Sequence, residues 1–280
     1  AGSFDFVFNL FALKHVRSES DPFTLMRMIN VNILNTIKTI DYAIKLGAQK
    51  YFCISTDKAA NPVSMMGASK RIMEMFLIQK SLNIDISTSR FANVAFSDGS
   101  LLHGFIQRIN KKQPISSPSD VRRYFLTSKE AGELCLLSGL LGNNKEIFFP
   151  KLSPELNLIS FDKIAIEYLN DIGYEPIICD TENEARQNIE NLNKERKWPC
   201  YFFTSDTTGE KDFEEFYTED EVIDIERFFN IGVIKSGLEF DEIKLKFFLA
   251  QIEEIKNLQH WEKGKLVALF DELIPNFNHL

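Results

Sequence analysis

The chain has 280 residues, enough for one large domain or two of ordinary size, and 44% of them are hydrophobic, which excludes a disordered or low-complexity protein. Its net charge is −8 and no run of Lys or Arg forms a basic stripe, so the sequence indicates no nucleic-acid partner. Its four cysteines include no CxxC pair, and no segment reaches the ~20 apolar residues of a membrane helix, so neither a metal site nor a membrane span is predicted.

Strands and helices alternate in the first half of the chain. Strands are expected at 4–9, 50–54, 85–91 and 146–149, and helices at 22–46, 64–82 and 131–141. Pro22 and Gly47 are favourable start and stop residues for the first of these helices. The alternation predicts an α/β fold with a doubly wound parallel sheet, and the apolar run at 4–9 is expected to be a buried strand of it.

The composition changes after residue 150, where Phe, Glu and Lys dominate. Helices are expected at 160–173, 241–258 and 261–273, and no internal repeat is present. We therefore expect two domains, a doubly wound one at 1–150 and a smaller, mostly helical lobe at 151–280.

Polar side chains follow the strand at 50–54 in the stretch STDKAANPVSMMGASKR. Ser55, Thr56, Asp57 and Lys58 stand at the carboxyl end of that strand, where open α/β sheets place ligands, and Lys70 follows on the next helix. Hydroxyl, carboxylate and ammonium groups can thus converge on one pocket. The alternative for side chains of these types is a solvated turn and a lysine on the surface of a helix.

This stretch resembles the active-site segment of the extended short-chain dehydrogenases/reductases, and most closely that of the nucleotide-sugar 4,6-dehydratases of polysaccharide and glycan biosynthesis. Further similarities occur in ALKHV at 12–16, in the helix asparagine Asn32, in RFANV at 90–94, in Gly99-Ser100, in RRYFLT at 122–127 and in GEKDFEEF at 209–216. Each similarity alone is weak, but their order along the chain makes the resemblance specific over most of residues 5–150.

The resemblance implies that residues 1–150 are the C-terminal part of a Rossmann-type dinucleotide-binding domain and that 151–280 hold the substrate lobe and C-terminal helices. The sequence contains no GxGxxG turn, with which such a sheet opens, so its first strand corresponds to the fourth strand of the family. A chain without that turn is expected to bind the cofactor poorly. Cytoplasmic location is implied, with membrane association only through a segment outside these residues.

The resemblance further implies a lyase with NAD or NADP that acts on a UDP-sugar, UDP-N-acetylglucosamine in particular. Hydride leaves C4 of the sugar, water is eliminated across C5 and C6, and hydride returns to C6, which gives a 4-keto-6-deoxy sugar. By this resemblance Asp57 is the acid that protonates the departing 6-hydroxyl, Lys58 is the base that removes the C5 proton, and Lys70 holds the nicotinamide ribose. A lysine base works best with a pKa near ~7–8, which burial and neighbouring cations favour.

Met66 stands where most of the superfamily has the tyrosine that deprotonates the hydroxyl being oxidised. Methionine has no proton to exchange, and one branch of these dehydratases is similar in having methionine there. In that branch the proton is expected to leave through Thr56, Asp57 or a water held by Lys70. A disabled remnant of an enzyme is the alternative, against which stands the retention of these residues together with Lys58.

The resemblance also assigns binding roles. Cofactor contacts are implied for Ala12, Asn32, Ser55 and Lys70, and substrate contacts for Lys14, His15, Asn93, Ser100, Arg123 and Glu210. Arginine suits a diphosphate because its planar fork binds two oxygens at once. Without the resemblance, Arg123 is typical of a surface strand, His15 of a packed structural histidine and Glu210 of a solvated turn.

The chain departs from the family pattern in several places. Asn9-Leu10-Phe11 replaces a small His-Ala-Ala run, Asp98 stands in place of an arginine, Thr208 stands in place of Arg-Pro, and Glu182–Asp206 looks like an insertion. The bulky side chains of Leu10 and Phe11 are expected near the cofactor.

Two alternatives to the dehydratase stay open. A UDP-sugar C4 epimerase oxidises C4 without eliminating water, and so needs neither Asp57 nor Lys58. A non-catalytic nucleotide-sugar-binding protein is favoured by Met66, Leu10 and Phe11.

The helices at 22–46 and 64–82 resemble the pair that forms a four-helix bundle between subunits in this superfamily. The apolar residues of the first helix cover more than one face, which is typical of a helix buried on two sides. A homo-oligomer of at least two chains is therefore expected.

Overall fold

The computed structural model describes residues 4–14, 19, 21–152, 158–205, 214–236, 239–258, 260–274 and 277. The chain separates into two compact units, which are described one at a time: unit 1 is Ala1–Ala92, Glu130–Lys151 and Glu215–Leu280, and unit 2 is Asn93–Lys129 and Leu152–Glu214. This division differs from the expected one at residue 150. Residues 93–129 belong to unit 2, and the C-terminal helices belong to unit 1.

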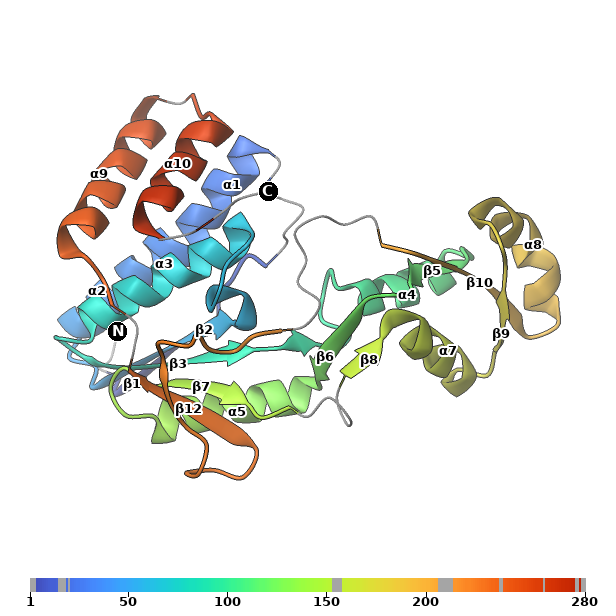
Figure 1. Ribbon diagram of the computed structural model, residues 1–280, viewed down its shortest axis with the longest axis horizontal. Helices are drawn as coiled ribbons and strands as arrows, with labels where there is room; N and C mark the ends of the chain where they lie inside the picture. The colour runs from blue at the N-terminus through green and yellow to red at the C-terminus, as the bar shows by residue number, and fades with distance from the viewer. Residues whose placement is uncertain are drawn as a thin grey trace. The chain divides into compact units, whose positions relative to one another are not determined.

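The described residues of unit 1 form a sheet with the strand order β1-β2-β3-β7-β12-β11 (Figure 1). Its parallel strands are β1 (Phe6–Asn9), β2 (Lys50–Thr56), β3 (Asp85–Phe91) and β7 (Ile147–Pro150). Two strands continue it in antiparallel pairs, β12 (Ile231–Ser236) and β11 (Val222–Asp224). The predicted α/β fold with a parallel sheet is thereby confirmed.

β1 lies at an edge of this sheet, where it pairs with β2. Phe4 and Phe6 are 59% and 45% exposed. The expectation of a buried strand at 4–9 is therefore wrong. An apolar run indicates that its side chains favour burial, but it does not show whether another element covers them.

One long helical segment lies between β1 and β2, and the helix α3 (Met65–Lys80) follows β2. The helix expected at 22–46 is continuous but changes its winding, from α1 (Pro22–Ile29) through the π-helical turn η2 (Asn30–Leu34) to α2 (Asn35–Lys45). The carboxylate of Asp21 caps α1 by accepting from the backbone N of Thr24 at 2.8 Å. Ser64 caps α3 in the same way, accepting from Gly67 N at 3.2 Å.

The helices cover both faces of the sheet. On one face Met73 and Leu77 of α3 pack with Tyr51 and Cys53 of β2. On the other face lies α5 (Ser128–Leu141), where Gly139 approaches the ring of Phe8 so closely that a Cβ would stand 2.3 Å from it. Helices on both faces are what a doubly wound sheet requires.

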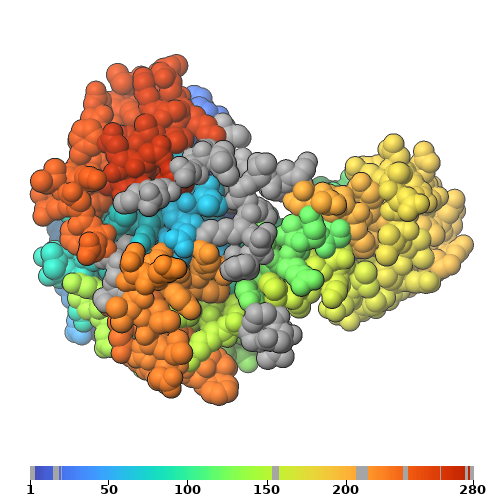
Figure 2. All heavy atoms as spheres, viewed as in Figure 1, coloured from blue at the N-terminus to red at the C-terminus, as the bar shows by residue number. Residues whose placement is uncertain are grey.

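Two C-terminal helices, α9 (Glu242–Leu258) and α10 (Lys263–Leu273), pack against α1 and α3 (Figure 1). Phe248 and Phe270 share one buried core with Ile29 and Phe76. In Figure 2 the atoms of α9 and α10, in red, form the outer surface of this part of unit 1. Apolar side chains of α1 and α3 are thus covered by the same chain, while the oligomer expected through the helices at 22–46 and 64–82 stays a prediction.

Unit 2 contains two small sheets in its described part. One sheet holds β4 (Asn93–Val94), β6 (Arg122–Leu126) and β8 (Leu158–Ser160), and the other holds β5 (Ile115–Pro118), β10 (Lys197–Phe203) and β9 (Glu175–Ile178). Its helices are α4 (Leu101–Asn110), α7 (Phe161–Asp171) and α8 (Glu182–Lys194). The segment expected to be an insertion therefore supplies α8 and β10.

Candidate active site

The predicted catalytic side chains lie together at the carboxyl end of β2, which runs into the short 3-10 turn η3 (Asp57–Ala59). Thr56 Oγ1 donates to Asp57 Oδ1 at 2.6 Å. Lys58 Nζ lies 3.3 Å and 3.2 Å from the two carboxylate oxygens of Asp57. The side chain of Asp57 is 4% exposed and that of Lys58 is 36% exposed, so a buried carboxylate is joined to an amine that reaches solvent.

Helix α3 approaches this turn closely at Gly67. A Cβ on Gly67 would stand 2.5 Å from the carbonyl oxygen of Lys58 and 3.3 Å from Cβ of Pro62. Side chains do not come this near to a backbone oxygen, so only glycine lets α3 lie against the turn at this point. The sequence reasoning did not single out Gly67.

Lys70 lies inside unit 1, because its side chain is almost fully buried. Its Nζ donates to the carbonyl oxygen of Ile54 at 3.0 Å and lies 3.6 Å from Sδ of Met73. Burial lowers the pKa of Lys70 from its usual value, although the nearby Cys53 and Glu74 oppose that shift. The alternative of a lysine on the helix surface is therefore wrong.

Met66 is buried at the start of α3, 4% exposed. Its carbonyl oxygen accepts from the hydroxyl of Ser69 at 2.7 Å. A thioether exchanges no proton, so Met66 cannot act as an acid or a base.

Asn32 joins three segments of unit 1 from within the π-helical turn η2. Its Nδ2 donates to Leu13 O at 3.0 Å and to Ser69 Oγ at 2.9 Å, and its Oδ1 accepts from Leu13 N at 2.9 Å. These bonds fix the loop after β1, which contains Ala12 and the exposed Lys14. The amide of Asn32 thus shapes the loop for which the resemblance implies cofactor and substrate contacts.

The bulky residues of the same loop point to solvent. Leu10 is 55% exposed and Phe11 is 79% exposed. Their expected proximity to the cofactor stays a prediction. His15, another residue predicted in this loop, lies outside the described residues, as do Thr208 and Glu210.

A buried polar network that the sequence reasoning missed begins at Ser55. The Ser55 hydroxyl donates to Glu74 Oε1 at 2.6 Å. Arg90 donates from Nε to Oε1 of Glu74 at 3.0 Å and from Nη2 to Oε2 at 2.8 Å. Ser55, predicted to contact the cofactor, therefore directs its hydroxyl into the protein.

Arg90 also binds the segment that leads into β11. Its Nη1 donates to Phe216 O at 2.8 Å and to Glu221 Oε2 at 2.7 Å, and its Nη2 donates to Glu221 Oε1 at 2.7 Å. All five N–H groups of this fully buried guanidinium are used. Burial lowers the pKa of Arg90, but Glu74 and Glu221 outweigh it and raise the pKa.

A signal for this network is present in the sequence. Glu74 stands in the apolar run IMEMFLI, and Arg90 is the next-to-last residue of the strand segment DISTSRF. Opposite charges inside segments that are expected to be buried indicate an internal ion pair, because an unpaired buried charge is too costly.

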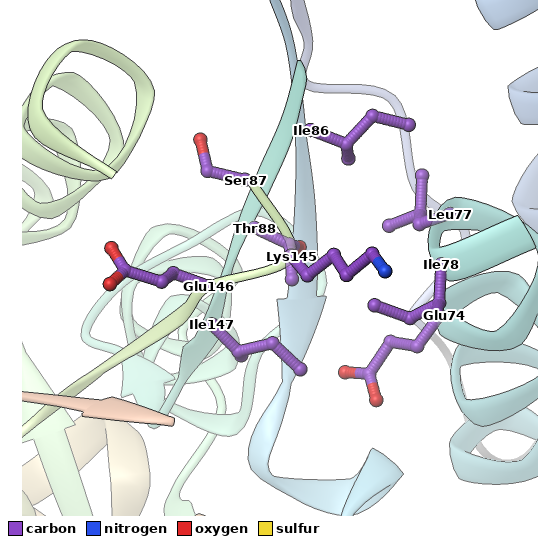
Figure 3. A pocket seen from close by; sticks show the side chains of 9 residues that line it. All are labelled: Glu74, Leu77, Ile78, Ile86, Ser87, Thr88, Lys145, Glu146 and Ile147. Carbon is purple, nitrogen blue, oxygen red and sulfur yellow. The ribbon is translucent and has the colours of Figure 1, made fainter. Parts of the chain in front are cut away.

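A small cavity lies beside this network, between α3, β3 and β7 (Figure 3). Its lining consists of Glu74, Leu77, Ile78, Ile86, Ser87, Thr88, Lys145, Glu146 and Ile147. The Lys145 side chain extends toward Leu77 and Ile78, whereas the carboxylate of Glu146 points away from them (Figure 3). The lining includes none of the predicted site residues, so this cavity is not the candidate active site.

In unit 2, two predicted substrate residues gather around the carboxylate of Glu214. Asn93 Nδ2 donates to Glu214 Oε1 at 2.5 Å, Tyr124 N donates to Oε2 at 3.2 Å, and Arg123 Nε lies 3.8 Å from Oε1. Arg123 is 9% exposed, so it is not the surface strand residue of the alternative interpretation. Ser100 lies apart from this group and caps α4 by accepting from His103 N at 3.1 Å.

None of the helices in the described ranges is long and apolar enough to cross a membrane.

Comparison with known proteins indicates the family of the chain. Residues 2–236 match the sequence profile of a family described as polysaccharide biosynthesis protein. The chain is 32% identical over 238 residues to an uncharacterized membrane protein of Methanocaldococcus jannaschii, covering 82% of this chain and 64% of that protein. It is 35% identical over 180 residues to the capsular polysaccharide biosynthesis protein CapD of Staphylococcus aureus, covering 60% and 29%. A UDP-glucose 4-epimerase of Rickettsia canadensis is 35% identical over 154 residues, covering 52% and 44%.

Solved structures are similar in fold. The X-ray structure of Pen from Bacillus thuringiensis matches with a TM-score of 0.66 at 20% identity, over 85% of this chain and 67% of that chain. The dTDP-glucose 4,6-dehydratase DesIV of Streptomyces venezuelae, with NAD bound, matches with a TM-score of 0.56 at 14% identity, over 77% and 65%. At such identities the likeness shows the fold alone. The chain spans less than two thirds of the length of the three curated relatives described above, and by the match to residues 2–236 it belongs to the polysaccharide biosynthesis protein family.

Proposed function

We propose that this protein is a nucleotide-sugar 4,6-dehydratase that converts a UDP-N-acetylhexosamine into a 4-keto-6-deoxy sugar. The proposed substrate of this class is UDP-N-acetylglucosamine. The observation that carries the proposal is the hydrogen-bonded set of Thr56, Asp57 and Lys58 at the carboxyl end of β2. Elimination of water needs one acid and one base on neighbouring carbons, and Asp57 and Lys58 supply both within one turn.

These three side chains form a path for the protons that replaces the absent tyrosine. The 4-hydroxyl of the sugar passes its proton to Thr56 Oγ1, while Thr56 passes its own to Asp57 Oδ1. Asp57 then holds the proton that leaves with the 6-hydroxyl as water. Lys58, in its neutral form, takes the C5 proton and later returns it to C5. The sum is the loss of one water and the movement of one hydride from C4 to C6, so Met66 needs no chemical role.

NAD or NADP, when bound, supplies the hydride acceptor for C4 and the donor for C6. Lys70 fits the ribose of such a cofactor, because an ammonium has three donors, of which two bind Ile54 O and Met73 Sδ. Ser55 and Asn32 fit a supporting role, since their polar groups bind Glu74, Leu13 and Ser69. Asn93 and Arg123 are proposed to bind the diphosphate, with Glu214 setting their orientation.

A UDP-sugar C4 epimerase is the second candidate, and the similarity to the Rickettsia epimerase supports it. An epimerase oxidises C4 and returns the hydride to the same carbon, so it has no use for an acid at C6. The pairing of buried Asp57 with Lys58 therefore favours the dehydratase.

The test is to incubate the full-length protein with UDP-N-acetylglucosamine and NAD or NADP and to follow the sugar by NMR. A 4-keto-6-deoxy product supports the dehydratase. A 4-epimer overturns it in favour of the second candidate, and binding without turnover indicates a nucleotide-sugar-binding protein instead.

A further inference from the structure

We infer that Glu74 is a positioning residue, which fixes the end of β2 through Ser55 and so holds the turn that carries Thr56, Asp57 and Lys58. The inference rests on the proposed function for its catalytic meaning. The hydrogen bonds that carry it all belong to unit 1.

One stripe of α3 touches the end of β2 and the turn at three successive points. Gly67 lies against the carbonyl oxygen of Lys58, Lys70 Nζ binds Ile54 O at 3.0 Å, and Glu74 accepts from the Ser55 hydroxyl at 2.6 Å. Spacings of three and four residues place these side chains on one face of a helix. The backbone on both sides of Thr56 is therefore attached to α3.

In the contact between Ser55 and α3, the residue on the helix, Glu74, is itself held in place by other hydrogen bonds. Arg90 binds both oxygens of Glu74, and every N–H of Arg90 is used by Glu74, Glu221 or Phe216 O. If Glu74 moved away, the buried guanidinium of Arg90 would be left partly unpaired, which is strongly unfavourable. Ser55 thus binds to an acceptor whose place is set by the whole network.

Hydrogen bonds orient this carboxylate, since Ser55 and Arg90 occupy both of its oxygens. Glu74 also lines the small cavity between α3, β3 and β7 (Figure 3). Loss of either Ser55 or the charge at position 74 would therefore free the strand end. Catalytic groups displaced by about 1 Å lose up to ~100-fold in rate, which makes such freedom visible in kcat.

The sequence offers a matched control in Glu221. Glu74 and Glu221 both bind Arg90 through two oxygens and both are buried, but only Glu74 binds Ser55. Glu74→Gln and Glu221→Gln each remove one negative charge from the same network. Glu221 also binds Arg71 and Thr218 N, so a purely structural role predicts a loss for Glu221→Gln at least as large as that for Glu74→Gln.

The experiment compares the full-length unmodified protein with Ser55→Ala, Glu74→Gln, Glu221→Gln and the double variant Ser55→Ala/Glu74→Gln. Amide hydrogen exchange is measured on peptides that cover 54–60 and 216–222, together with melting temperature, kcat and KM on UDP-N-acetylglucosamine. We expect Ser55→Ala and Glu74→Gln to speed exchange at 54–60 and to lower kcat by about 10-fold or more with little change in KM. The double variant should lose no more than the worse single variant, because both remove one interaction.

Glu221→Gln should lower the melting temperature as Glu74→Gln does, but speed exchange at 216–222 and cost less in kcat. Equal exchange at 54–60 in Ser55→Ala and the unmodified protein would overturn the inference, as would equal kcat losses in the two glutamine variants. Where Glu74→Gln does not fold, Ser55→Ala decides. If the unmodified protein shows no turnover, the proposed function fails, while the exchange data still decide whether Glu74 positions the turn.

Discussion

Lys58 Nζ faces both carboxylate oxygens of Asp57, at 3.2 Å and 3.3 Å, and this pair is joined to solvent through Lys58. A proton taken from C5 by Lys58 can therefore exchange with water before it returns. For a reaction run in D₂O we expect one deuterium at C5 of the 4-keto-6-deoxy product and none at C6, measured by NMR. Deuterium at C6 would contradict the proposed roles.

Lys58→Met should remove both turnover and deuterium incorporation, with a loss of at least about 100-fold in kcat, the lower range for a general base. The Lys58 side chain is 36% exposed but that of Asp57 is only 4% exposed, so the melting temperature should fall when this buried carboxylate loses its cation. Lys45→Met, in the exposed face of α2, is the control and should keep full activity. Unchanged kcat in Lys58→Met would require another base.

Lys70 is buried and its pKa is lowered by burial, so its charged form destabilises the folded state. The unfolded chain, with a lysine pKa near ~10.4, then binds the proton more readily, and the contribution of Lys70 to stability improves as pH rises toward that value. Lys70→Met should therefore be more stable than the unmodified protein near neutral pH, by about 1–4 kcal/mol, while losing activity.

The measurement for Lys70 is the melting temperature of both proteins from pH 6 to pH 10. The difference in favour of Lys70→Met should shrink as the pH rises, because the unmodified protein then carries less charge at this position. A difference that stays constant, or a variant less stable at every pH, would show that the bond to Ile54 O outweighs the desolvation of the amine.

Gly67→Ala should destabilise the protein by about 1–3 kcal/mol, the range for inserting a group into a packed site, because its Cβ would stand 2.5 Å from Lys58 O. It should also lower kcat, since α3 must move away from the turn. Gly132→Ala is the matched control in α5, where nothing lies within 4 Å of the added Cβ. That variant should be equal to the unmodified protein or more stable, by up to about 1 kcal/mol. Equal stability of both alanine variants in urea unfolding would refute the steric argument.

Leu266 of α10 is fully buried in the core shared by α1, α3, α9 and α10. Leu266→Asp should release the α9–α10 hairpin and expose an apolar surface that promotes self-association. Sedimentation velocity at micromolar concentration should show larger species than for the unmodified protein, and residues 242–258 should become protease-sensitive. Ile243→Asp, at a position of α9 that is 81% exposed, should change neither property. A monodisperse, protease-resistant Leu266→Asp would contradict this role of the hairpin.

The sequence predicted those parts of the fold that depend on neighbouring residues. The turn after β2 and the start of α3 follow from a strand end and from Ser64, whose hydroxyl caps the helix. Because β2, the turn and α3 are consecutive, local structure alone brings the side chains between Ser55 and Lys70 close together.

Contacts between distant segments could not be predicted in this way. Glu221 binds Arg90 from 131 positions away, and no local pattern relates the two. The strand β10 was missed for another reason: Pro199 stands inside it, and proline argues against a strand. In the structure Pro199 aligns with Ile177 of β9, while the alignment of β10 with β5 starts at Cys200.

The division of unit 1 into separate stretches of sequence has a consequence for synthesis on the ribosome. The core that Phe76 enters is completed by Phe248 and Phe270, which are translated much later. At a translation rate of ~5–20 residues per second, on the order of ten seconds or more pass between the synthesis of α3 and that of the helices α9 and α10 that cover its apolar side. During that interval the apolar side chains of α1 and α3 are exposed on the nascent chain. We therefore expect the chain to depend on a ribosome-bound chaperone until the last helices emerge.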